Sequence, residues 1–265
     1  MKQLIIMMCI QLTGYVYSMN KTLKTIIKKI IFFPKRVVQG IIILPDYIRF
    51  QNKNNQRFSL KIKDFYPQVL DKTRTTGFDR HYVYHTAWAA RKVQEINPQK
   101  HIDIASSLYF PAIVSAFVPV DFYDYRPAEI ELSGLTSNHA DLLNLHFSDN
   151  SIESISCMHT IEHVGLGRYG DPIDPMGDIK AINELQRVTA KGGSILFVTP
   201  VGIPKIEFNA HRIYSYEQIM NYFNECELVE FSLIPEHVGG IVKNANPELV
   251  KSGSYDCGCF WFKKK

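Results

Sequence analysis

The chain has 265 residues, of which 46% are hydrophobic and 21% charged, and its formal net charge is +4. These proportions are typical of a globular protein and exclude a disordered chain. The five cysteines contain no C-x-x-C pair, which excludes a disulfide framework and a zinc finger, so we expect reduced thiols in the core and no metal ligands.

The charge is divided unevenly along the chain. Residues 1–63 hold 12 lysines and arginines against one acid, a net charge of +11, whereas residues 64–265 carry a net charge of −7. Such an asymmetry indicates a basic arm, with an anionic partner, on a mildly acidic domain. We expect an arm over residues 1–50, a polar linker over 51–77 and a folded domain over 78–265.

The first segment of the arm, residues 3–20, is uncharged. It has three interpretations: a leader in front of a start at Met19, a membrane-associated segment, or a cleaved signal peptide. The next segment has helical spacing, because apolar side chains recur three and four residues apart, and we expect Pro34 to end that helix. The apolar residues are Leu23, Ile26, Ile27, Ile30 and Ile31.

Lysines accompany this apolar face, which is typical of a helix that lies on an anionic membrane surface. We expect this contact for residues 19–50; the alternative is a helix packed on the domain with solvated lysines. Nucleic acid is not expected, because the arm lacks interleaved aromatic and arginine residues. The expected location is the cytoplasm, peripheral to the membrane.

The domain alternates expected strands with expected helices. The strands are expected at 101–105, 120–125, 152–158, 194–198, 228–233 and 257–263, and the helices at 82–96, 108–117, 178–188 and 216–223. This order predicts an α/β fold, a mostly parallel sheet with helices on both faces. The last strand alternates Cys257, Cys259 and Trp261 with Phe260 and Phe262, which burial on both faces explains without a metal.

Three acids follow apolar strands in this domain: Asp103, Asp124 and Asp141. Ligands of such sheets bind at the carboxyl ends of the strands, and an acid about 20 residues past the first turn can accept both hydroxyls of a ribose. A further acid beside an apolar residue can accept the amine of adenine. The three acids therefore predict a pocket for an adenosine-containing cofactor.

The segments HIDIASS, VDFYDYRP, ADLLNL, SIESISCMHTIEHVG and KGGSILFVTP occur in an order that resembles class I S-adenosylmethionine-dependent methyltransferases. The resemblance covers about residues 78–265 and implies a Rossmann-like sheet of seven strands with an antiparallel last strand. More narrowly, HTIEHVGLGRYGDPIDPMGD and FNAHRIYSYEQI resemble an uncharacterised methyltransferase-like family, a domain of unknown function associated with bacterial surface-polysaccharide genes.

The resemblance implies S-adenosylmethionine as cofactor and assigns positions in its site. His159 would lie beside the cofactor, Asp124 with Tyr125 at the ribose, Asp141 with Leu142 at the adenine, and the first motif would comprise Asp103, Ala105, Ser106 and Ser107. The superfamily motif is D-x-G-x-G, so Ala105 and Ser107 stand where glycines let the backbone approach the cofactor. This departure puts the strength of cofactor binding in doubt.

Catalytic candidates follow the 152–158 strand. Glu162 and His163 would face the acceptor and remove its proton. His211 and Arg212 have two interpretations: they hold an anionic or sugar acceptor, or they serve in capping or packing. The glycine-rich loop at 165–171 has two interpretations, a lid over the substrate or a plain connection. We expect methyl transfer to an oxygen or nitrogen of a small or glycan-type acceptor; the acceptor's identity and the oligomeric state stay open.

Two other functions remain as alternatives. A degenerate cofactor fold without glycines can serve as a non-catalytic binding module. The segment His159-Thr160-Ile161-Glu162-His163 also matches H-x-x-E-H, a zinc hydrolase motif with two histidine ligands and a glutamate base. That chemistry needs the motif on a helix and a third ligand downstream.

Overall fold

The computed structural model describes residues 21–53 and 57–265, and it gives side-chain environments from residue 37 onward within them. The segment 3–20, with its three interpretations, lies outside the described residues. The chain divides between Gly77 and Phe78 into two compact units, and each is described here by itself.

In its described part, the N-terminal unit contains a long helix, α2 (Lys21–Lys53), and a 3-10 turn, η1 (Ile62–Asp64). The expectation that Pro34 ends the helix is wrong, because α2 continues through Pro34 and Pro45. An internal proline costs a helix about 3 kcal/mol, yet the apolar helical pattern resumes beyond it at Val37, Val38, Ile41 and Ile42. Among the described residues, no helix combines the length and hydropathy that a bilayer span requires.

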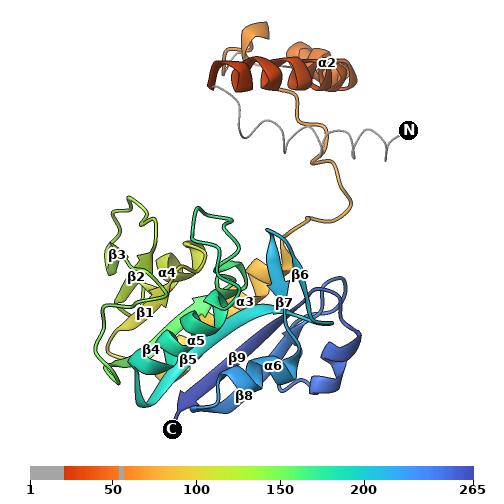
Figure 1. Cartoon of the computed structure of the whole chain (residues 1–265). Helices are drawn as coiled ribbons and strands as arrows, with labels where there is room; N and C mark the ends of the chain where they lie inside the picture. The colour runs from red at the N-terminus through yellow and green to blue at the C-terminus, as the bar shows by residue number, and fades with distance from the viewer. Residues whose placement is uncertain (1–20, 54–56) are drawn as a thin grey trace. The chain divides into compact units, whose positions relative to one another are not determined.

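The C-terminal unit is built on a sheet of seven strands (Figure 1) in the order β3-β2-β1-β4-β5-β9-β8. The strands are β1 (His101–Ile104), β2 (Val120–Asp124), β3 (Leu135–His139), β4 (Ile152–Met158), β5 (Thr189–Val201), β8 (Cys226–Ile234) and β9 (Asp256–Lys264). The ladders from β3 to β5 are parallel, whereas β9 runs antiparallel to both β5 and β8. This topology confirms the expected Rossmann-like fold with an antiparallel last strand.

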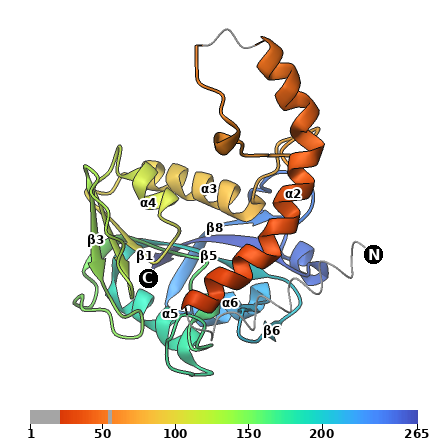
Figure 2. The same ribbon diagram turned by 90° about the horizontal axis from the view of Figure 1, so that it is seen from above.

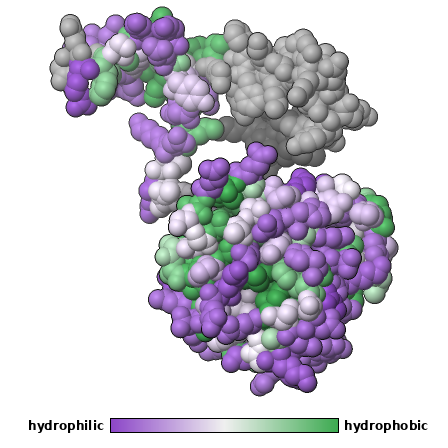
Figure 3. Space-filling model, turned by 90° about the vertical axis from the view of Figure 1, so that its left-hand side faces the viewer, coloured by the Kyte–Doolittle hydropathy of each residue, from purple (hydrophilic) through white to green (hydrophobic). Residues whose placement is uncertain are grey.

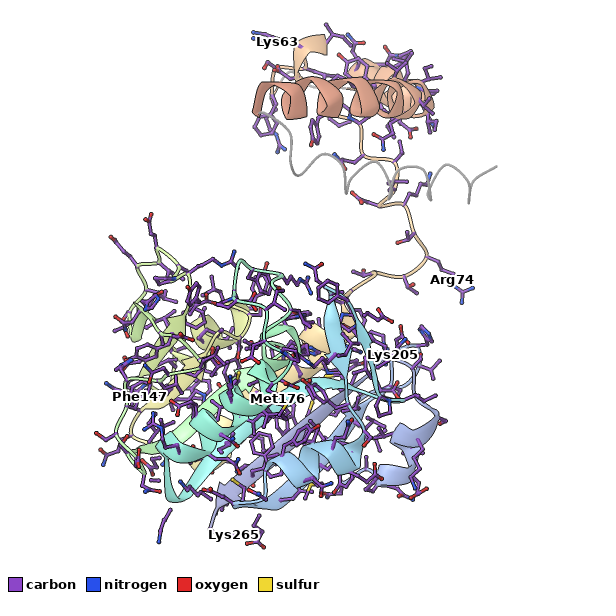
Figure 4. All side chains as sticks on the ribbon, viewed as in Figure 1. Lys63, Arg74, Phe147, Met176, Lys205 and Lys265 are labelled. Atoms are coloured by element: carbon purple, nitrogen blue, oxygen red, sulfur yellow. The ribbon has the colours of Figure 1, made fainter. Side chains whose placement is uncertain are left out.

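Helices cover both faces of this sheet (Figure 2). On one face lie α3 (Arg80–Ile96) and α4 (Tyr109–Val114), which pack Trp88, Val93 and Phe110 against the strands. On the other lie α5 (Gly177–Val188) and α6 (Tyr216–Tyr222), which contribute residues such as Ile182 and Ile219 to a second apolar cluster. Side chains fill the layers between sheet and helices (Figure 4). Both faces of the central strands are therefore buried, as a parallel sheet requires.

The last strand shows this burial on both faces. Phe260 and Phe262 join the cluster under α5 and α6, while Cys257, Cys259 and Trp261 join the cluster under α3 and α4. The alternation expected from the sequence is confirmed. The start of α6 is also confirmed, because the side chain of Ser215 accepts a hydrogen bond from the backbone of Gln218 in a capping box.

Two features of the fold were not expected from the sequence. The edge strand β3 buries only Leu135 of its five residues, so it lacks an apolar strand signal; Figure 3, which views the molecule from that side, shows a mainly hydrophilic face. A short hairpin of β6 (Lys205–Glu207) and β7 (His211–Ile213) is equally inconspicuous. In α3 the histidines His81 and His85 are buried, whereas Tyr82 is 39% exposed.

Candidate functional site

A cavity of about 230 Å³ opens at the carboxyl ends of the parallel strands, where ligands of such sheets bind. Its walls come from the residues that follow β1, β2, β3 and β4, and from the loop beyond η2 (Ile161–His163). We call it the first cavity. Its lining includes Ala105, Asp124, Tyr125, Asp141, Leu142, His159, Thr160, His163, Tyr169 and Asp171.

Two of the three predicted acids reach this cavity. Asp124 ends β2, and its Oδ1 accepts a hydrogen bond from the backbone N–H of Arg126 at 2.7 Å. Asp141 follows β3, and its Oδ1 accepts from the backbone N–H of Leu143 at 2.9 Å. In each turn one carboxylate oxygen orders the backbone, which fixes the direction of the side chain toward the cavity.

Asp103 lies below the cavity and does not line it. It is fully buried, its Oδ1 accepts from the backbone N–H of Ser106 at 3.2 Å, and its Oδ2 accepts from the hydroxyl of Ser156. Burial raises the pKa of Asp103 to about 7, although the bonds from Ser156 and Ser106 oppose this shift. Asp103 therefore holds the turn after β1 in place.

The turn after β1 adopts the backbone that its glycine-poor sequence disfavours. Ala105 has φ +55°, in the left-handed region where glycine is preferred. Its carbonyl accepts a hydrogen bond from the Thr160 hydroxyl at 2.9 Å. Ser106 is buried and accepts from the backbone N–H of Met158 at 3.1 Å, and Ser107 is half-buried outside the cavity lining. Of the first motif, only Ala105 and its neighbour Ile104 reach the cavity.

A second cavity, of about 510 Å³, lies beside the first. His159, His163 and Tyr169 line both cavities. The other walls of the second cavity are mostly charged or aromatic: Phe78, Asp79, Arg80, His81, Tyr82, Glu162, Arg168, Glu236, His237 and Tyr255. The two cavities therefore adjoin and differ in the side chains of their walls, and imidazole groups lie at their junction.

Glu162 and His159 form a buried pair at this junction. The Oε1 atom of Glu162 lies 2.9 Å from Nδ1 of His159, and the two side chains are 1% and 4% exposed. Burial disfavours the charge on each, but the hydrogen bond between them outweighs it, so the pKa of Glu162 is lowered. The Oε2 atom of Glu162 is buried without a hydrogen-bond partner among the described residues. The pair thus presents a carboxylate oxygen with free acceptor capacity.

His163 is oriented by the neighbouring hairpin. Its Nδ1 lies 2.6 Å from the carbonyl oxygen of Ala210 and donates to it, which leaves Nε2 as an acceptor. This Nε2 lies 3.8 Å from Oε1 of Glu162. Burial lowers the pKa of His163, against the opposing effect of Glu162. The imidazole is therefore neutral at neutral pH, as a general base must be.

The glycine-rich loop is ordered by one side chain. Asp171 accepts hydrogen bonds from the backbone N–H groups of Gly165, Gly167 and Tyr169 at 2.8 to 3.3 Å. Burial would raise the pKa of Asp171, but these donors outweigh it and lower the pKa. Gly165 has φ +79°, and a Cβ there would lie 2.0 Å from the carbonyl oxygen of Asp174. The loop carries Tyr169, whose ring is 4.9 Å from the guanidinium of Arg126.

The residues predicted from the Phe208–Arg212 segment divide into two groups. His211 lies near the second cavity without lining it, with its ring 4.8 Å from that of Tyr255 and 6.4 Å from that of His163. Arg212 is buried, and its Nη1 donates to the carbonyl oxygen of Val164 at 2.6 Å. The guanidinium of Arg212 is therefore used inside the domain, which agrees with the packing alternative for this residue.

The zinc hydrolase motif does not have the required geometry. Residues 161–163 form a 3-10 turn rather than an α-helix. His163 donates from Nδ1 to Ala210, and Glu162 bonds to His159 instead of facing a metal held between the two histidines. The structure thus does not support His159 and His163 as a ligand pair.

Several site residues were missed in the sequence. His81, Tyr82 and Tyr255 line the second cavity, and the rings of His81 and Tyr82 lie 5.5 and 5.4 Å from that of His159. His81 and His85 are four residues apart, which places both on the buried face of α3. That spacing was the one available signal, because Tyr255 reaches the site only through the pairing of β9 with β5.

The sequence profile of the family described as "Caenorhabditis protein of unknown function, DUF268" matches residues 123–233. This region runs from the end of β2 into β8 and includes the junction of the two cavities. No significantly similar sequence was found among curated proteins.

Similar solved structures have low identity. An S-adenosylmethionine-dependent methyltransferase from Clostridium acetobutylicum is 14% identical with a TM-score of 0.45, over 69% of this chain and 92% of its own. A TehB-like SAM-dependent methyltransferase from Corynebacterium glutamicum is also 14% identical with a TM-score of 0.45, over 69% and 89%. YcgJ from Bacillus is 12% identical with a TM-score of 0.46, over 68% and 98%. All three TM-scores are below 0.5.

Proposed function

We propose that the domain over residues 78–265 transfers a methyl group from S-adenosylmethionine to an oxygen or nitrogen of a small, polar acceptor. The observation that carries the proposal is that two cavities at the carboxyl ends of the strands share His159, His163 and Tyr169. The first would hold the cofactor and the second the acceptor. Their common wall would bring the two reactants together, which supplies much of the rate of a displacement reaction.

The residues of the first cavity offer the chemical groups that this cofactor needs. Asp124 places a carboxylate at the end of β2, where it can accept both ribose hydroxyls, and Asp141 with Leu142 offers a carboxylate and an apolar wall for adenine. The volume of about 230 Å³ is below the range of about 300–1,000 Å³ that is usual for such sites. The Cβ of Ala105 occupies part of this space, so binding is expected to be weaker than with glycine there.

When bound, the cofactor supplies an electrophilic methyl group on a sulfonium. The domain's own residues position the acceptor and take its proton. Nε2 of His163 is a neutral acceptor at the junction, and the free Oε2 of Glu162 is a second base in the second cavity. As the acceptor's oxygen or nitrogen bonds to the methyl carbon, its proton passes to one of these bases. Tyr169, on the ordered loop, forms part of the wall of both cavities at this junction.

The polar lining of the second cavity favours an acceptor rich in hydroxyl or amine groups, such as a sugar. Arg80 and Arg168 lie among the acids Asp79, Glu162 and Glu236, so both signs of charge are available for hydrogen bonding. An apolar acceptor would displace water from these groups without replacing its hydrogen bonds, which is costly. We therefore place a glycan-type or other polar small molecule in this cavity.

Calorimetric titration of the full chain with S-adenosylhomocysteine tests the cofactor assignment. We expect saturable binding that Asp124→Asn weakens by about 10-fold or more, because a hydrogen bond to a charged group contributes about 1.5–3 kcal/mol. Asp121→Asn is the matched control, since Asp121 lies on the same strand but bonds to Lys100 and Thr136 away from the cavity. Absence of binding up to about 1 mM, or an equal effect of the two variants, would overturn the assignment.

We also propose that α2 attaches the chain to an anionic lipid surface. The helix carries eight lysines and arginines and one acid, Asp46. In its described part, Val38, Ile41, Ile42 and Phe50 are each more than half exposed. Exposed apolar side chains with an excess of cations match the chemistry of an anionic membrane interface.

Co-sedimentation with vesicles tests this attachment. The full chain should pellet with phosphatidylserine-containing vesicles at low salt, and less with pure phosphatidylcholine vesicles or at high salt. Ile41→Ser with Ile42→Ser should reduce the pelleted fraction several-fold, whereas Val229→Ser, at an exposed apolar position of the domain, should not. No pelleting with anionic vesicles at low salt would refute the attachment.

A further inference from the structure

Three potential metal ligands meet beneath the second cavity. The ligand atoms of His81, His159 and Cys257 lie within 4.8 Å of one another, and all three residues are buried. They come from distant parts of the chain: the first turn of α3, the residue after β4 and the start of β9. Such a convergence of two imidazoles and a thiol inside a domain is a donor set that suits zinc and related divalent transition metals.

His159 is oriented as a metal ligand would be. Its Nδ1 is bound to the Glu162 carboxylate at 2.9 Å, so Nε2 is the atom that faces Cys257. In metal sites, the other ring N–H of a histidine ligand usually donates a hydrogen bond to a carboxylate in this way. This bond fixes the tautomer and makes the metal-binding nitrogen more basic. Glu162 is buried and makes this bond with one oxygen. The pair is therefore a ready-made ligand with its supporting carboxylate.

The separation between two of the donors matches a shared metal. Nε2 of His159 and Sγ of Cys257 are 3.4 Å apart. Bonds of about 2.0 Å to nitrogen and 2.3 Å to sulfur at a tetrahedral angle place the two donors about 3.5 Å apart. A thiol–imidazole hydrogen bond also explains this distance, so the third donor has to decide between the two explanations.

His81 is the third donor, and the hydrogen bond between Cys257 and His159 does not explain why its imidazole lies beside them. Its Nε2 is buried and has no hydrogen-bond partner among the described residues. A buried polar atom without a partner costs about 1–3 kcal/mol. A metal between His81, His159 and Cys257 would satisfy it after a shift of about 1 Å in the donor separation. His81 lies in the first turn of α3, at the wall of the second cavity.

We propose that His81, His159 and Cys257 bind a divalent transition metal of the zinc type, with Glu162 supporting His159. Three protein ligands leave the fourth tetrahedral position open. Because His81 and His159 line the second cavity, that position faces it and can take a water or an oxygen, nitrogen or sulfur atom of a bound molecule. This site does not depend on the proposed methyl transfer and is tested without it.

Metal analysis of the full chain is the first test. After incubation with excess Zn²⁺ and removal of the unbound metal, we expect about one zinc per chain. Replacement by Co²⁺ should give the charge-transfer absorption of a thiolate-bound cobalt and the visible bands of a tetrahedral site. A folded wild-type chain with neither stoichiometric zinc nor a thiolate–cobalt band would overturn the proposal.

Variants assign the ligands. Cys257→Ser should abolish the thiolate–cobalt band, His81→Gln should weaken metal binding, and Glu162→Gln should weaken it by about 10- to 100-fold. Cys226→Ser is the matched control, because Cys226 is a buried thiol of β8 in the other apolar cluster. Circular dichroism shows whether each variant folds. If Cys257→Ser misfolds, metal binding by His81→Gln and the cobalt spectrum of the wild type test the ligand assignment. Full metal content in folded Cys257→Ser or His81→Gln would contradict the assignment.

Discussion

The carboxylate of Glu162 and the imidazole of His159 are joined by a 2.9 Å hydrogen bond inside the domain, at the junction of two cavities. They are three positions apart in the sequence, and a 3-10 turn brings them together. His159 itself has φ +52°, a costly backbone for a residue other than glycine. Such strain is concentrated at functional sites, and here it accompanies a buried charge pair.

Glu162→Gln tests the role of this pair in methyl transfer. The amide cannot take a proton, so we expect turnover to fall by about 10²-fold or more with any acceptor that the wild type methylates. S-adenosylhomocysteine release measures turnover, and calorimetry should show nearly unchanged cofactor binding. Glu225→Gln, at an exposed residue far from both cavities, is the control. Unchanged turnover in Glu162→Gln would exclude Glu162 as a base.

The pH dependence of turnover tests His163. Burial lowers the pKa of this imidazole below its usual 6.5. The basic form is therefore present above the lowered pKa and is lost as the pH falls through it. We expect an acid limb of kcat below pH 6.5 in the wild type. His163→Asn keeps a donor for Ala210 but removes the base, so this limb should disappear, whereas His146→Asn, at an exposed residue, should retain it. An identical limb in His163→Asn would assign it to another group.

Asp103 should give the domain a pH-dependent stability. Its pKa is raised to about 7 in the folded state, so the folded chain binds more protons than the unfolded chain between about pH 4 and 7. The free energy of unfolding should therefore fall as the pH rises through this window. Asp103→Asn, which has no charge to bury, should lack this fall.

Urea unfolding at several pH values measures the effect. The stability of Asp103→Asn relative to wild type should increase from pH 4 to about 7 and then level off. Glu153→Gln, at an exposed residue of β4, should show no comparable trend. A constant difference between Asp103→Asn and wild type across this range would show that Asp103 has an ordinary pKa.

Ala105→Gly restores the glycine of the superfamily's first motif. Relief of the left-handed strain of about 1–2 kcal/mol exceeds the entropic cost of glycine, about 0.4–1 kcal/mol. We expect a gain in stability of up to about 1 kcal/mol together with tighter S-adenosylhomocysteine binding, because a Cβ leaves the first cavity. Thermal unfolding and calorimetry measure the two effects.

Ala140→Gly is the matched control for this variant. Ala140 lines the same cavity but does not have a positive φ. Glycine there should lower stability by at least about 0.5–1 kcal/mol, because it adds chain entropy to the unfolded state and also removes a buried methyl group. Equal changes in stability for the two variants would show that Ala105 carries no strain.

Local patterns were enough to predict the parallel sheet and part of its site. Buried strands such as Ile152–Met158 consist mostly of apolar and small side chains, which signals a strand. The acids Asp124 and Asp141 lie at or just after the ends of strands, so their arrival at one cavity could be predicted. The edge strand β3 could not be predicted, because four of its five side chains remain outside the core. The placement of Asp103 below the cavity depends on Ser156 of β4, which local sequence does not reveal.

The second cavity is the part that depends most on tertiary structure. His81 and Tyr255 are separated by most of the domain, yet their rings lie 5.2 Å apart. Cys257 looked like a core thiol of an alternating strand, and it is one, but it also meets His159 across 98 residues. Neither spacing nor composition signals contacts between residues so far apart in the sequence. The second cavity could therefore be found only in the folded chain.

A crystal structure of the full chain soaked with S-adenosylhomocysteine tests the central claim most directly. We predict the ligand in the first cavity, with its ribose hydroxyls on the Asp124 carboxylate and its sulfur at the wall formed by His159, His163 and Tyr169. This position would point the transferable methyl group of S-adenosylmethionine into the second cavity. Density for the ligand elsewhere, or a first cavity that stays free of it at saturating concentration, would contradict the account.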